Sequence, residues 1–359
     1  MIEIDIRPVW RFRAGGAERE FDFALITLLA GIESGGKLTH AAEAAGMSYR
    51  HAWNRVAEWE AFFGAPLVVK SRGRGTSLTR LGQRLLRAGQ RVRARLAPEL
   101  ENLAGDFART LNETLSETVP SLVVLASHDY AVAGLRGLSA SSDATLDVQY
   151  RGSFDALAAL RRGECDMAGF HVPEGALGAL MRRRYREFLP RGTFSLVGFV
   201  TRTQGFLVKR GNPKRVRGVA DLARGGIRLA NRQRGSGTRA LLESLITAAG
   251  LERDAIRGYE TEETTHGAVA ALVAGHQADV GFGVQAAAHE YGLDFVPVCR
   301  ERYFFALRTA DLETAPVRSL LQLLRGDAFG RWVGQLPGYD AWHAGTVLED
   351  LAPEPAVQP

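Results

Sequence analysis

The segment NRQRGSGTRALLE, residues 231–243, combines side chains and a turn that suit a small anion. It places three arginines around a Gly-Ser-Gly-Thr turn, and an apolar helix follows the turn. Backbone N–H groups at the start of a helix, hydroxyl groups and guanidinium groups all donate hydrogen bonds to anions. We therefore predict ligand contacts from Arg234, Ser236, Gly237, Thr238 and Arg239. For Arg232 and Arg234, a position on the surface, away from any ligand, is an equally open alternative.

The chain from Ser121 onward alternates short β-like runs with helical stretches, which predicts an α/β domain with largely parallel strands. The predicted strands include four separate short runs at 194–200, 204–211, 293–299 and 303–308. In such sheets ligands lie beyond the carboxyl ends of the strands. The polar residues expected at that edge, and hence in the ligand site, are Ser127, Ser153, His171 and His266.

Three other chemistries are conceivable for this half of the chain. A phosphate-binding loop of the nucleotide hydrolases needs a lysine that residues 234–239 do not contain. Gly235 to Ala240 matches the dinucleotide pattern GxGxxA, with Glu260 twenty residues on, but the motif lies too deep in the chain to open a βαβ domain. Ser127, His128 and Asp129 are sequence neighbours without a G-x-S-x-G elbow, which argues against a hydrolase. We predict that the chain is not an enzyme.

The amino-terminal region has the pattern of a helix-turn-helix. An apolar helix ends at Gly35-Gly36, an alanine-rich helix ends at Gly46, and Ser48 stands where an N-cap belongs. Ala52, Val56, Trp59 and Phe63 recur at helical spacing and form the expected buried face of the next helix. We therefore predict a recognition helix whose DNA-contacting residues are Ser48, Tyr49, Arg50, Asn54 and Arg55.

A Gly-rich basic hairpin follows, PLVVKSRGRGTSLT, whose Lys70, Arg72 and Arg74 we expect to contact the DNA backbone as a wing. Residues 50–95 hold eleven lysines and arginines against two acidic residues, a net charge of +9 in a chain of net charge +5. Such a basic block is typical of proteins that bind the phosphate backbone. A solvated helix face is the alternative.

Leucines recur at three- and four-residue steps over residues 78–115, which predicts a long helical stretch interrupted or kinked at Pro98. An exposed leucine stripe of this length favours a homodimer or a higher homo-oligomer, with packing inside one chain as the alternative. The DNA-binding domain is then expected at 1–78 and the helical linker at 79–118.

Two family resemblances follow from these residues. GGKLTHAAEAAGMSYRHAWNRVAEWE and SLTRLGQRLL resemble the DNA-binding region of ModE-type molybdate-responsive regulators, and more distantly that of LysR-type regulators. SFDALAALRRGECDMAGFHVP, TQGFLVKRGNP, ANRQRGSGTRALLE and THGAVAALVAGHQADVGFG resemble a molybdate-type periplasmic-binding-protein-like domain. The resemblance implies a two-lobed type II domain at 121–345, with crossings at 201–210 and 294–303 and a tail at 346–359.

The function that these resemblances imply is a ligand-responsive transcriptional regulator. It would bind a double-stranded DNA operator and a small anionic effector: molybdate, tungstate or a compound related to the molybdenum cofactor. A small organic anion such as a carboxylate is the alternative effector, since the site is richer in arginine than related molybdate sites.

Composition is consistent with a soluble globular protein, 46% hydrophobic and 24% charged. The two cysteines, Cys165 and Cys299, have no second ligand at metal spacing, so neither a disulfide framework nor a metal site is expected. With no secretory signal and no membrane span expected, the sequence predicts a cytoplasmic protein without a cofactor.

Overall fold

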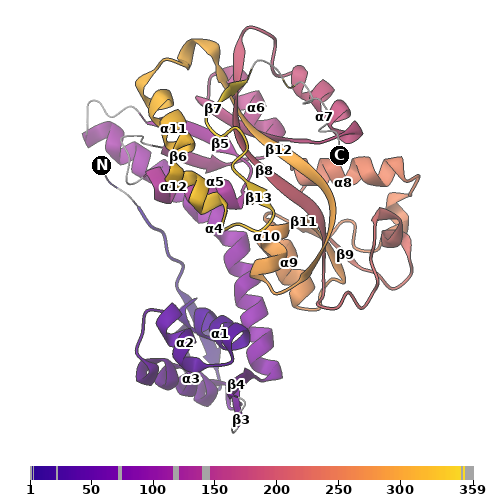
Figure 1. The fold of residues 1–359 in the computed structure, drawn as a ribbon. Helices are drawn as coiled ribbons and strands as arrows, with labels where there is room; N and C mark the ends of the chain where they lie inside the picture. Colours follow the sequence, from indigo (N-terminus) through magenta and orange to yellow (C-terminus); the bar gives the residue numbers. More distant parts are fainter. Residues whose placement is uncertain are drawn as a thin grey trace. The chain divides into compact units, whose positions relative to one another are not determined.

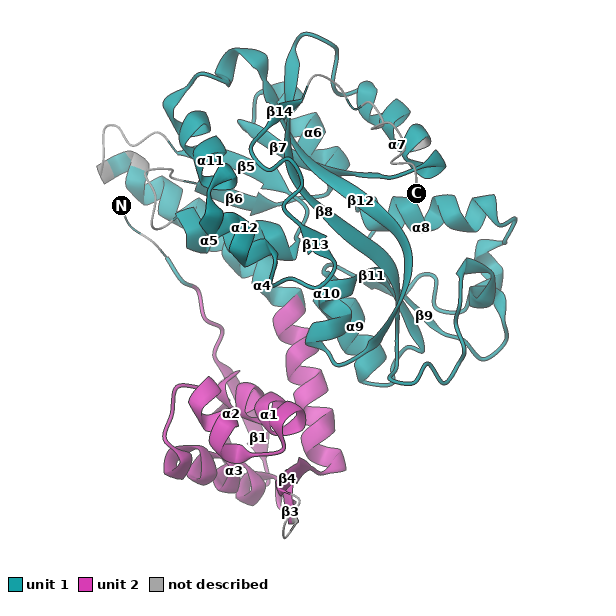
Figure 2. Cartoon of the chain, viewed as in Figure 1, with its two compact units in different colours: residues 1–5, 95–359 teal, residues 6–94 magenta. Residues whose placement is uncertain are grey.

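The computed structural model describes residues 2, 4–21, 23–71, 75–115, 121–139, 146–348 and 351. The chain forms two compact units, one of residues 6–94 and the other of residues 1–5 and 95–359 (Figure 2). Each unit has its own buried core.

The 6–94 unit is a small helical domain with two β-hairpins (Figure 1). An aromatic core holds it together, with the ring of Trp59 against those of Phe12 and Phe21. The elements are β1 (Trp10–Ala14), β2 (Ala17–Phe21), α1 (Phe23–Gly35), α2 (Leu38–Ala44), α3 (Tyr49–Phe63), β3 (Val68–Ser71), β4 (Gly75–Leu78) and the first part of α4 (Arg80–Leu115).

The helix-turn-helix depends on a close approach of α1 and α2. A methyl group added at Gly31 would lie 2.7 Å from the Cα of Ala41, so only glycine fits there. Gly46 turns the chain after α2 with a φ of +66°, which glycine adopts without strain. Ser48 then caps α3, where its hydroxyl accepts the backbone N–H of His51.

Helix α4 is continuous from Arg80 to Leu115, so the expected interruption at Pro98 was wrong. Contacts beyond the proline hold the helix against β6 (Leu146–Tyr150). The Asn102 side chain accepts the N–H of Tyr150 at 2.7 Å and donates to its carbonyl at 3.2 Å, and Arg109 donates to Asp147 at 2.8 Å. These tertiary bonds offset the backbone bond that a proline removes.

The 95–359 unit is an α/β domain with two lobes (Figure 1). The first lobe has β5 (Leu122–Ala126), β6 and β7 (Met167–Pro173), with α5 (Tyr130–Ser139), α6 (Ser153–Arg162), α7 (Ala176–Arg186), α11 (Ala315–Arg325) and α12 (Asp327–Val333). The second lobe has β9 (Leu229–Arg232), β10 (Glu262–Glu263) and β11 (Val280–Val284), with α8 (Gly237–Ala248), α9 (His266–Ala274) and α10 (Gln285–Glu290).

Two long strands, β8 (Phe194–Val208) and β12 (Asp294–Arg308), link the lobes and pair with each other in antiparallel fashion. Over the described residues the strand order is β10-β9-β11-β8-β12-β7-β5-β6, and the short β13 (Tyr339–Asp340) and β14 (Val347–Leu348) pair with β8. Strands within each lobe are parallel, and the linking strands are antiparallel to their neighbours. The sheet is therefore mixed rather than largely parallel.

The four short strands predicted at 194–200, 204–211, 293–299 and 303–308 are in fact these two 15-residue strands. The charged residues between the apolar runs read as loop residues in the sequence. In the structure Arg202 of β8 lies buried against Glu301 of β12, and their ion pair of 2.9 Å allows both strands to continue through the core. A cross-strand charge pair of this kind cannot be recognised from one strand alone.

Candidate functional site

Four of the predicted ligand-binding positions adjoin one another where the two lobes meet, and a fifth, His266, interacts with them electrostatically. Ser127 follows β5 and its Oγ lies 3.3 Å from the Oγ of Ser153. Ser153 begins α6 and contacts Nδ1 of His171, in β7, at 3.2 Å. Gly237 begins α8 in the other lobe, where an added methyl group would lie 3.3 Å from the same nitrogen. His266, at the start of α9, is coupled electrostatically to this group through His171.

Three helices begin at this group of residues, and the amino-terminal end of each contributes to the electrostatic potential there. Ser153, Gly237 and His266 are each the first residue of their helices α6, α8 and α9. Helix amino termini carry partial positive charge and N–H groups without helical partners. The absence of a side chain at Gly237 leaves that backbone close to the imidazole of His171. The arrangement favours a small anion.

Several buried polar atoms in this region have no hydrogen-bond partner among the residues that the structure describes. They are Nδ1 of His128, Nε2 of His171, Nδ1 of His266 and the hydroxyl groups of Tyr185 and Tyr303. The rings of His171 and Tyr303 lie 4.2 Å apart, which brings two of these atoms into one neighbourhood. Buried polar groups are costly when unpaired, so such a concentration is typical of a ligand site.

Arg202 is a fully buried cation whose charge is neutralised by protein groups. Its guanidinium lies 2.5 Å from Asp129 and 2.9 Å from Glu301. Tyr339 donates to Asp129 at 2.7 Å, and Gln204 donates to Glu301 at 2.9 Å and to the Thr238 hydroxyl at 2.8 Å. This network, which we call the hinge network, joins both linking strands to the first lobe through Asp129 and to the second through Thr238.

Arg232, the last residue of β9, is buried like Arg202 but has no carboxylate partner within the described part of the chain. Its side chain donates to the Oε1 of Gln233 at 3.1 Å and to the carbonyl oxygen of Thr264 at 3.0 Å. Burial, reinforced by the positive charge of Arg202, lowers the pKa of Arg232 to about 9. The guanidinium stays cationic at neutral pH, and a bound anion would supply the missing counter-charge.

The three histidines of the region, His128, His171 and His266, form what we call the histidine cluster. Burial, and next the charge of Arg232, lowers the pKa of His128 to about 4. Burial followed by Arg202 lowers the pKa of His171, and burial followed by Arg232 lowers that of His266. All three imidazoles are therefore neutral in the free protein at pH 7, and each can donate through an N–H.

The arginine-rich loop that suggested an anion site brings one of its three arginines, Arg232, near the histidine cluster, and the other two have partners elsewhere. Arg239 is buried, but its donors are occupied by Glu243 at 2.9 Å and by the carbonyl oxygens of Arg232 and Tyr259. Arg234 is exposed over 73% of its side chain and pairs with Glu260 at 2.9 Å. Both arginines are thus paired with glutamates of the second lobe, and both also line a hollow together with Phe154 and Arg184 of the first lobe.

The hydroxyl groups of the same loop also have protein partners. Ser236 caps α8, accepting the N–H of Arg239 at 3.1 Å and donating to the carbonyl of Gln233. Thr238 belongs to the hinge network. Of the loop residues predicted to contact ligand, Gly237 alone is placed against the histidine cluster by its contacts in the described structure.

The sequence pattern did not single out Arg202, Tyr185 or Tyr303. It named Arg232 only among the arginines of the loop, with a surface position left open, and His128 only in the hydrolase alternative. Arg202 and Arg232 carry a recoverable signal, because each is a charged residue inside or at the end of an apolar strand. The two tyrosines lie within stretches of ordinary helix or strand pattern.

Asp129 accepts from Arg202, Tyr339 and the N–H of Ala131, so its oxygens are not directed at His128 as a hydrolase relay requires.

The predicted DNA-binding residues lie on the 6–94 unit. Tyr49, Arg50 and Asn54 are exposed on α3 and Arg55 is partly buried there, while Ser48 serves as the cap. The ammonium of Lys70 lies 3.5 Å from the centre of the Trp53 ring, which holds this side chain of β3 beside α3. Arg72 and Arg74 lie outside the described residues.

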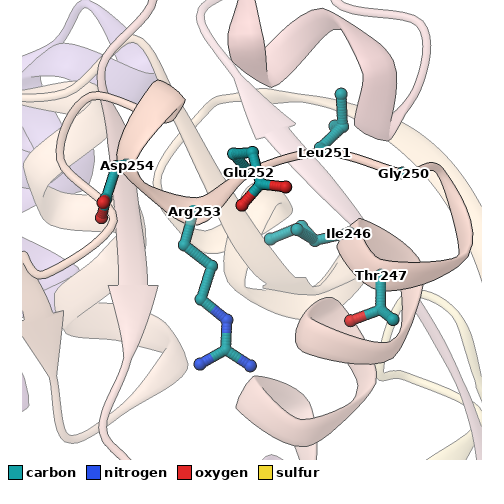
Figure 3. A pocket seen from close by; sticks show the side chains of 7 residues that line it. All are labelled: Ile246, Thr247, Gly250, Leu251, Glu252, Arg253 and Asp254. Carbon is teal, nitrogen blue, oxygen red and sulfur yellow. The ribbon is translucent and has the colours of Figure 1, made fainter.

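A separate surface hollow lies at the carboxyl end of α8 (Figure 3). Its lining mixes two acidic side chains with one basic side chain and shares no residue with the histidine cluster: Ile246, Thr247, Gly250, Leu251, Glu252, Arg253 and Asp254. Across the residues that the structure describes, no group of histidine, cysteine and acidic side chains could hold a metal ion. None of the described helices is both long and apolar enough to cross a bilayer.

Comparison with protein families matches residues 136–325 to the PBP superfamily domain and residues 24–83 to the bacterial regulatory helix-turn-helix of the lysR family. The uncharacterized protein YvgK of Bacillus subtilis is 31% identical over 200 residues, which cover 56% of this chain and 64% of YvgK. An uncharacterized protein encoded in the 5′ region of a ferredoxin gene of Clostridium pasteurianum is 29% identical over 112 residues, 31% of this chain and 99% of its own.

Among solved structures, a Corynebacterium glutamicum OxyR C206 mutant is similar with a TM-score of 0.41 and 13% identity. The alignment covers 84% of this chain and 90% of that one.

Proposed function

Because the chain belongs to the PBP superfamily and carries a lysR-family helix-turn-helix, we propose that it is a DNA-binding transcriptional regulator controlled by a small anion. The 6–94 unit would bind an operator, and the lobes of the 95–359 unit would hold the effector. A ligand changes DNA affinity only to the extent that it binds the two conformations of the regulator differently. Closure of the lobes around the effector would provide that difference.

The observation that carries the proposal is the buried guanidinium of Arg232. It has no carboxylate partner among the described residues, and the histidine cluster beside it is neutral. A cationic ligand would be repelled by both arginines, and a neutral one would leave the Arg232 charge uncompensated. An anion both neutralises Arg232 and accepts hydrogen bonds from the unpaired imidazoles and phenols.

We propose a tetrahedral oxyanion, molybdate or tungstate, or a compound related to the molybdenum cofactor, as the effector. The resemblance of the sequence to molybdate-responsive proteins supports the choice. The abundance of hydroxyl and N–H donors around Ser127, Ser153 and His171 supports it as well. A small carboxylate is the second candidate, which the planar, two-pronged donor geometry of Arg232 would suit.

Thermal unfolding of the full chain with molybdate, tungstate, sulfate, phosphate and acetate tests the ligand class. A ligand at a hundred times its Kd stabilises the folded state by about 2.7 kcal/mol, a measurable shift in Tm. We expect the shift with molybdate and tungstate, and we expect Arg232→Met to remove it. Arg234→Met is the matched control, because that arginine is exposed and paired on the surface.

A shift that persists in Arg232→Met would move the anion site elsewhere. A shift with acetate alone would select the carboxylate candidate.

DNA binding by the 6–94 unit is proposed to use Tyr49, Arg50, Asn54, Arg55, Lys70, Arg72 and Arg74. Each phosphate contact that is lost should reduce the slope of log affinity against log salt concentration by about 0.9. Arg50→Ala is therefore expected to flatten the salt dependence on duplex DNA. Arg13→Ala serves as control, because Arg13 pairs with Glu18 in the β1–β2 hairpin. Equal slopes for Arg50→Ala and the wild type would remove Arg50 from the interface.

Dimerisation through α4 is proposed as well. Leu103 and Phe107 stand one helical turn apart and are 58% and 56% exposed. Apolar pairs of this size are usually covered by a partner. Regulators of the helix-turn-helix class commonly bind two half-sites as dimers.

A further inference from the structure

We propose that the effector site takes a doubly charged tetrahedral oxyanion together with one proton, and that the proton is held by the histidine cluster. The inference rests on the proposed function, since it assumes an anion between the lobes. It adds that the site selects ligands that carry two negative charges, and that the affinity for such a ligand depends on pH because a proton is bound with it.

The charges already present in the site decide how much negative charge it can accept. Arg202 is compensated by Asp129 and Glu301, which leaves Arg232 as the uncompensated cation next to the histidines. One unit of negative charge on a ligand would therefore neutralise Arg232. The second unit on a dianion would remain uncompensated in a buried environment, where an unpaired charge is strongly disfavoured.

The histidine cluster is the part of the site that can change its charge near neutral pH. Each of its rings has a buried nitrogen without a partner in the described structure, so each can approach a ligand oxygen. A negative charge within a few ångströms favours the protonated imidazole. Binding of a dianion would thus raise the pKa of an imidazole that is neutral in the free protein.

Among the described residues around the cluster, the carboxylates of Asp129 and Glu301 are paired with Arg202, so the imidazoles are the groups left to take up a proton. Around His128 lie Arg232, Asp129 and the ring of Tyr150, and around His171 lie Arg202, Arg232, Ser153 and Tyr303. His266 is influenced by Arg232, Arg202 and the other two histidines, and Gly283 of β11 adjoins its Nδ1. The tyrosine hydroxyls are already protonated, because burial raises the pKa of both Tyr185 and Tyr303.

One proton rather than two follows from repulsion within the cluster. His266 is influenced by the charges of both His128 and His171, so a second imidazolium would oppose the first. Both arginines repel the cluster as well, and His266 stands at the amino terminus of α9, where the helix dipole disfavours a cation. A dianion with one added proton restores neutrality around Arg232, and a second proton would again leave an excess positive charge.

The experiment compares tungstate with perrhenate, a tetrahedral oxyanion of the same electron count that carries one negative charge. Isothermal titration calorimetry of the full chain, in buffers of different ionisation enthalpy, gives the number of protons taken up and the Kd. For tungstate we expect uptake of one proton, with Kd rising up to tenfold for each pH unit over a range of roughly pH 6 to 8. For perrhenate we expect no uptake and no pH dependence.

A variant pair assigns the proton to the cluster. His171→Gln keeps a side chain that can donate a hydrogen bond but cannot hold the extra proton, and His266→Gln does the same at the other lobe. At least one of them is expected to lose the pH dependence of tungstate binding that the wild type shows. His289→Gln is the control, because His289 is exposed at the end of α10.

The outcomes separate the two proposals. Tungstate binding with no proton uptake overturns the inference of a bound proton and leaves the anion-regulated function standing. Failure of both tetrahedral anions to bind refutes the oxyanion class and the bound proton with it. The wild-type comparison of the two anions needs no substitution, so a variant that fails to fold leaves that comparison intact.

Discussion

Replacing Arg232 by methionine should stabilise the free protein while abolishing anion binding. Burial and Arg202 together lower the pKa of Arg232 from 12.5 to about 9. Each pKa unit corresponds to about 1.36 kcal/mol, so the folded state holds this charge at a cost of about 5 kcal/mol. Methionine fills a similar length of the cavity with an apolar chain and removes that cost.

Part of the gain is offset by hydrogen bonds that methionine cannot make. The guanidinium donates to the Oε1 of Gln233 and to the carbonyl oxygen of Thr264. Leaving these acceptors unpaired costs about 1–3 kcal/mol. We therefore expect Arg232→Met to raise the free energy of unfolding by about 2–4 kcal/mol, the cost of the buried charge less the cost of the lost hydrogen bonds.

The assay is calorimetric unfolding of the wild type and the variant without added anion and at low salt, followed by the same scans with tungstate. We expect a higher Tm for Arg232→Met without anion and no further rise with tungstate, whereas the wild type rises only with tungstate. Arg234→Met should behave like the wild type in both scans. A variant that is less stable than the wild type would refute the reasoning, because Arg232 would then be a structural cation rather than a ligand-binding one.

Three further predictions concern charges and packing elsewhere. The pKa of His128 is lowered from 6.5 to about 4, so between these pH values the unfolded chain takes up a proton that the folded chain does not. The free protein should therefore lose up to about 3 kcal/mol of stability as the pH falls from 6.5 to 4. Denaturant titrations over this pH range should show that His128→Gln lacks this loss. Arg239→Ala should destabilise by about 1–3 kcal/mol, since Glu243 and Glu262 are partly exposed and keep Tyr259 and Arg234 as partners, yet tungstate should still shift the Tm of the variant; a variant whose Tm no longer responds to tungstate would return Arg239 to the ligand site. Gly31→Ala should cost about 1–3 kcal/mol because its methyl group would meet Ala41 at 2.7 Å, and Gly35→Ala in the same helix, which has open space, should not; equal urea midpoints for the two variants would show that α1 and α2 do not pack as described.

The sequence predicted the local elements of the amino-terminal unit well, because helix-turn-helix structure depends on short-range signals. Gly46 and Ser48 mark the turn and the cap directly, and the spacing of Ala52, Val56 and Trp59 defines the buried face of α3. The long helix was predicted, but its continuity through Pro98 was not, because the bonds that hold it there join Asn102 to a strand more than forty residues away.

The grouping of polar residues at the carboxyl ends of the strands was also predictable, since residues that follow parallel strands lie at the same end of the sheet. Ser127, Ser153, His171 and Gly237 do adjoin one another. The sequence could not assign charges to partners. It suggested Arg234 and Arg239 for the anion because they surround a helix-opening turn, and in the structure both are paired with glutamates of their own lobe.

What the sequence by itself determined is the order of domains: a basic helix-turn-helix followed by an α/β domain, whose donors suit the anion that we propose. Only the tertiary structure decided which cation is available to that anion. Arg202 and Arg232 look alike in the sequence, each lying in a strand of mostly apolar residues. The fold brings Asp129 and Glu301 to the first and no carboxylate among the described residues to the second. Because the free energy of a buried charge depends on neighbours supplied by distant segments, that distinction cannot be read from the residues beside it.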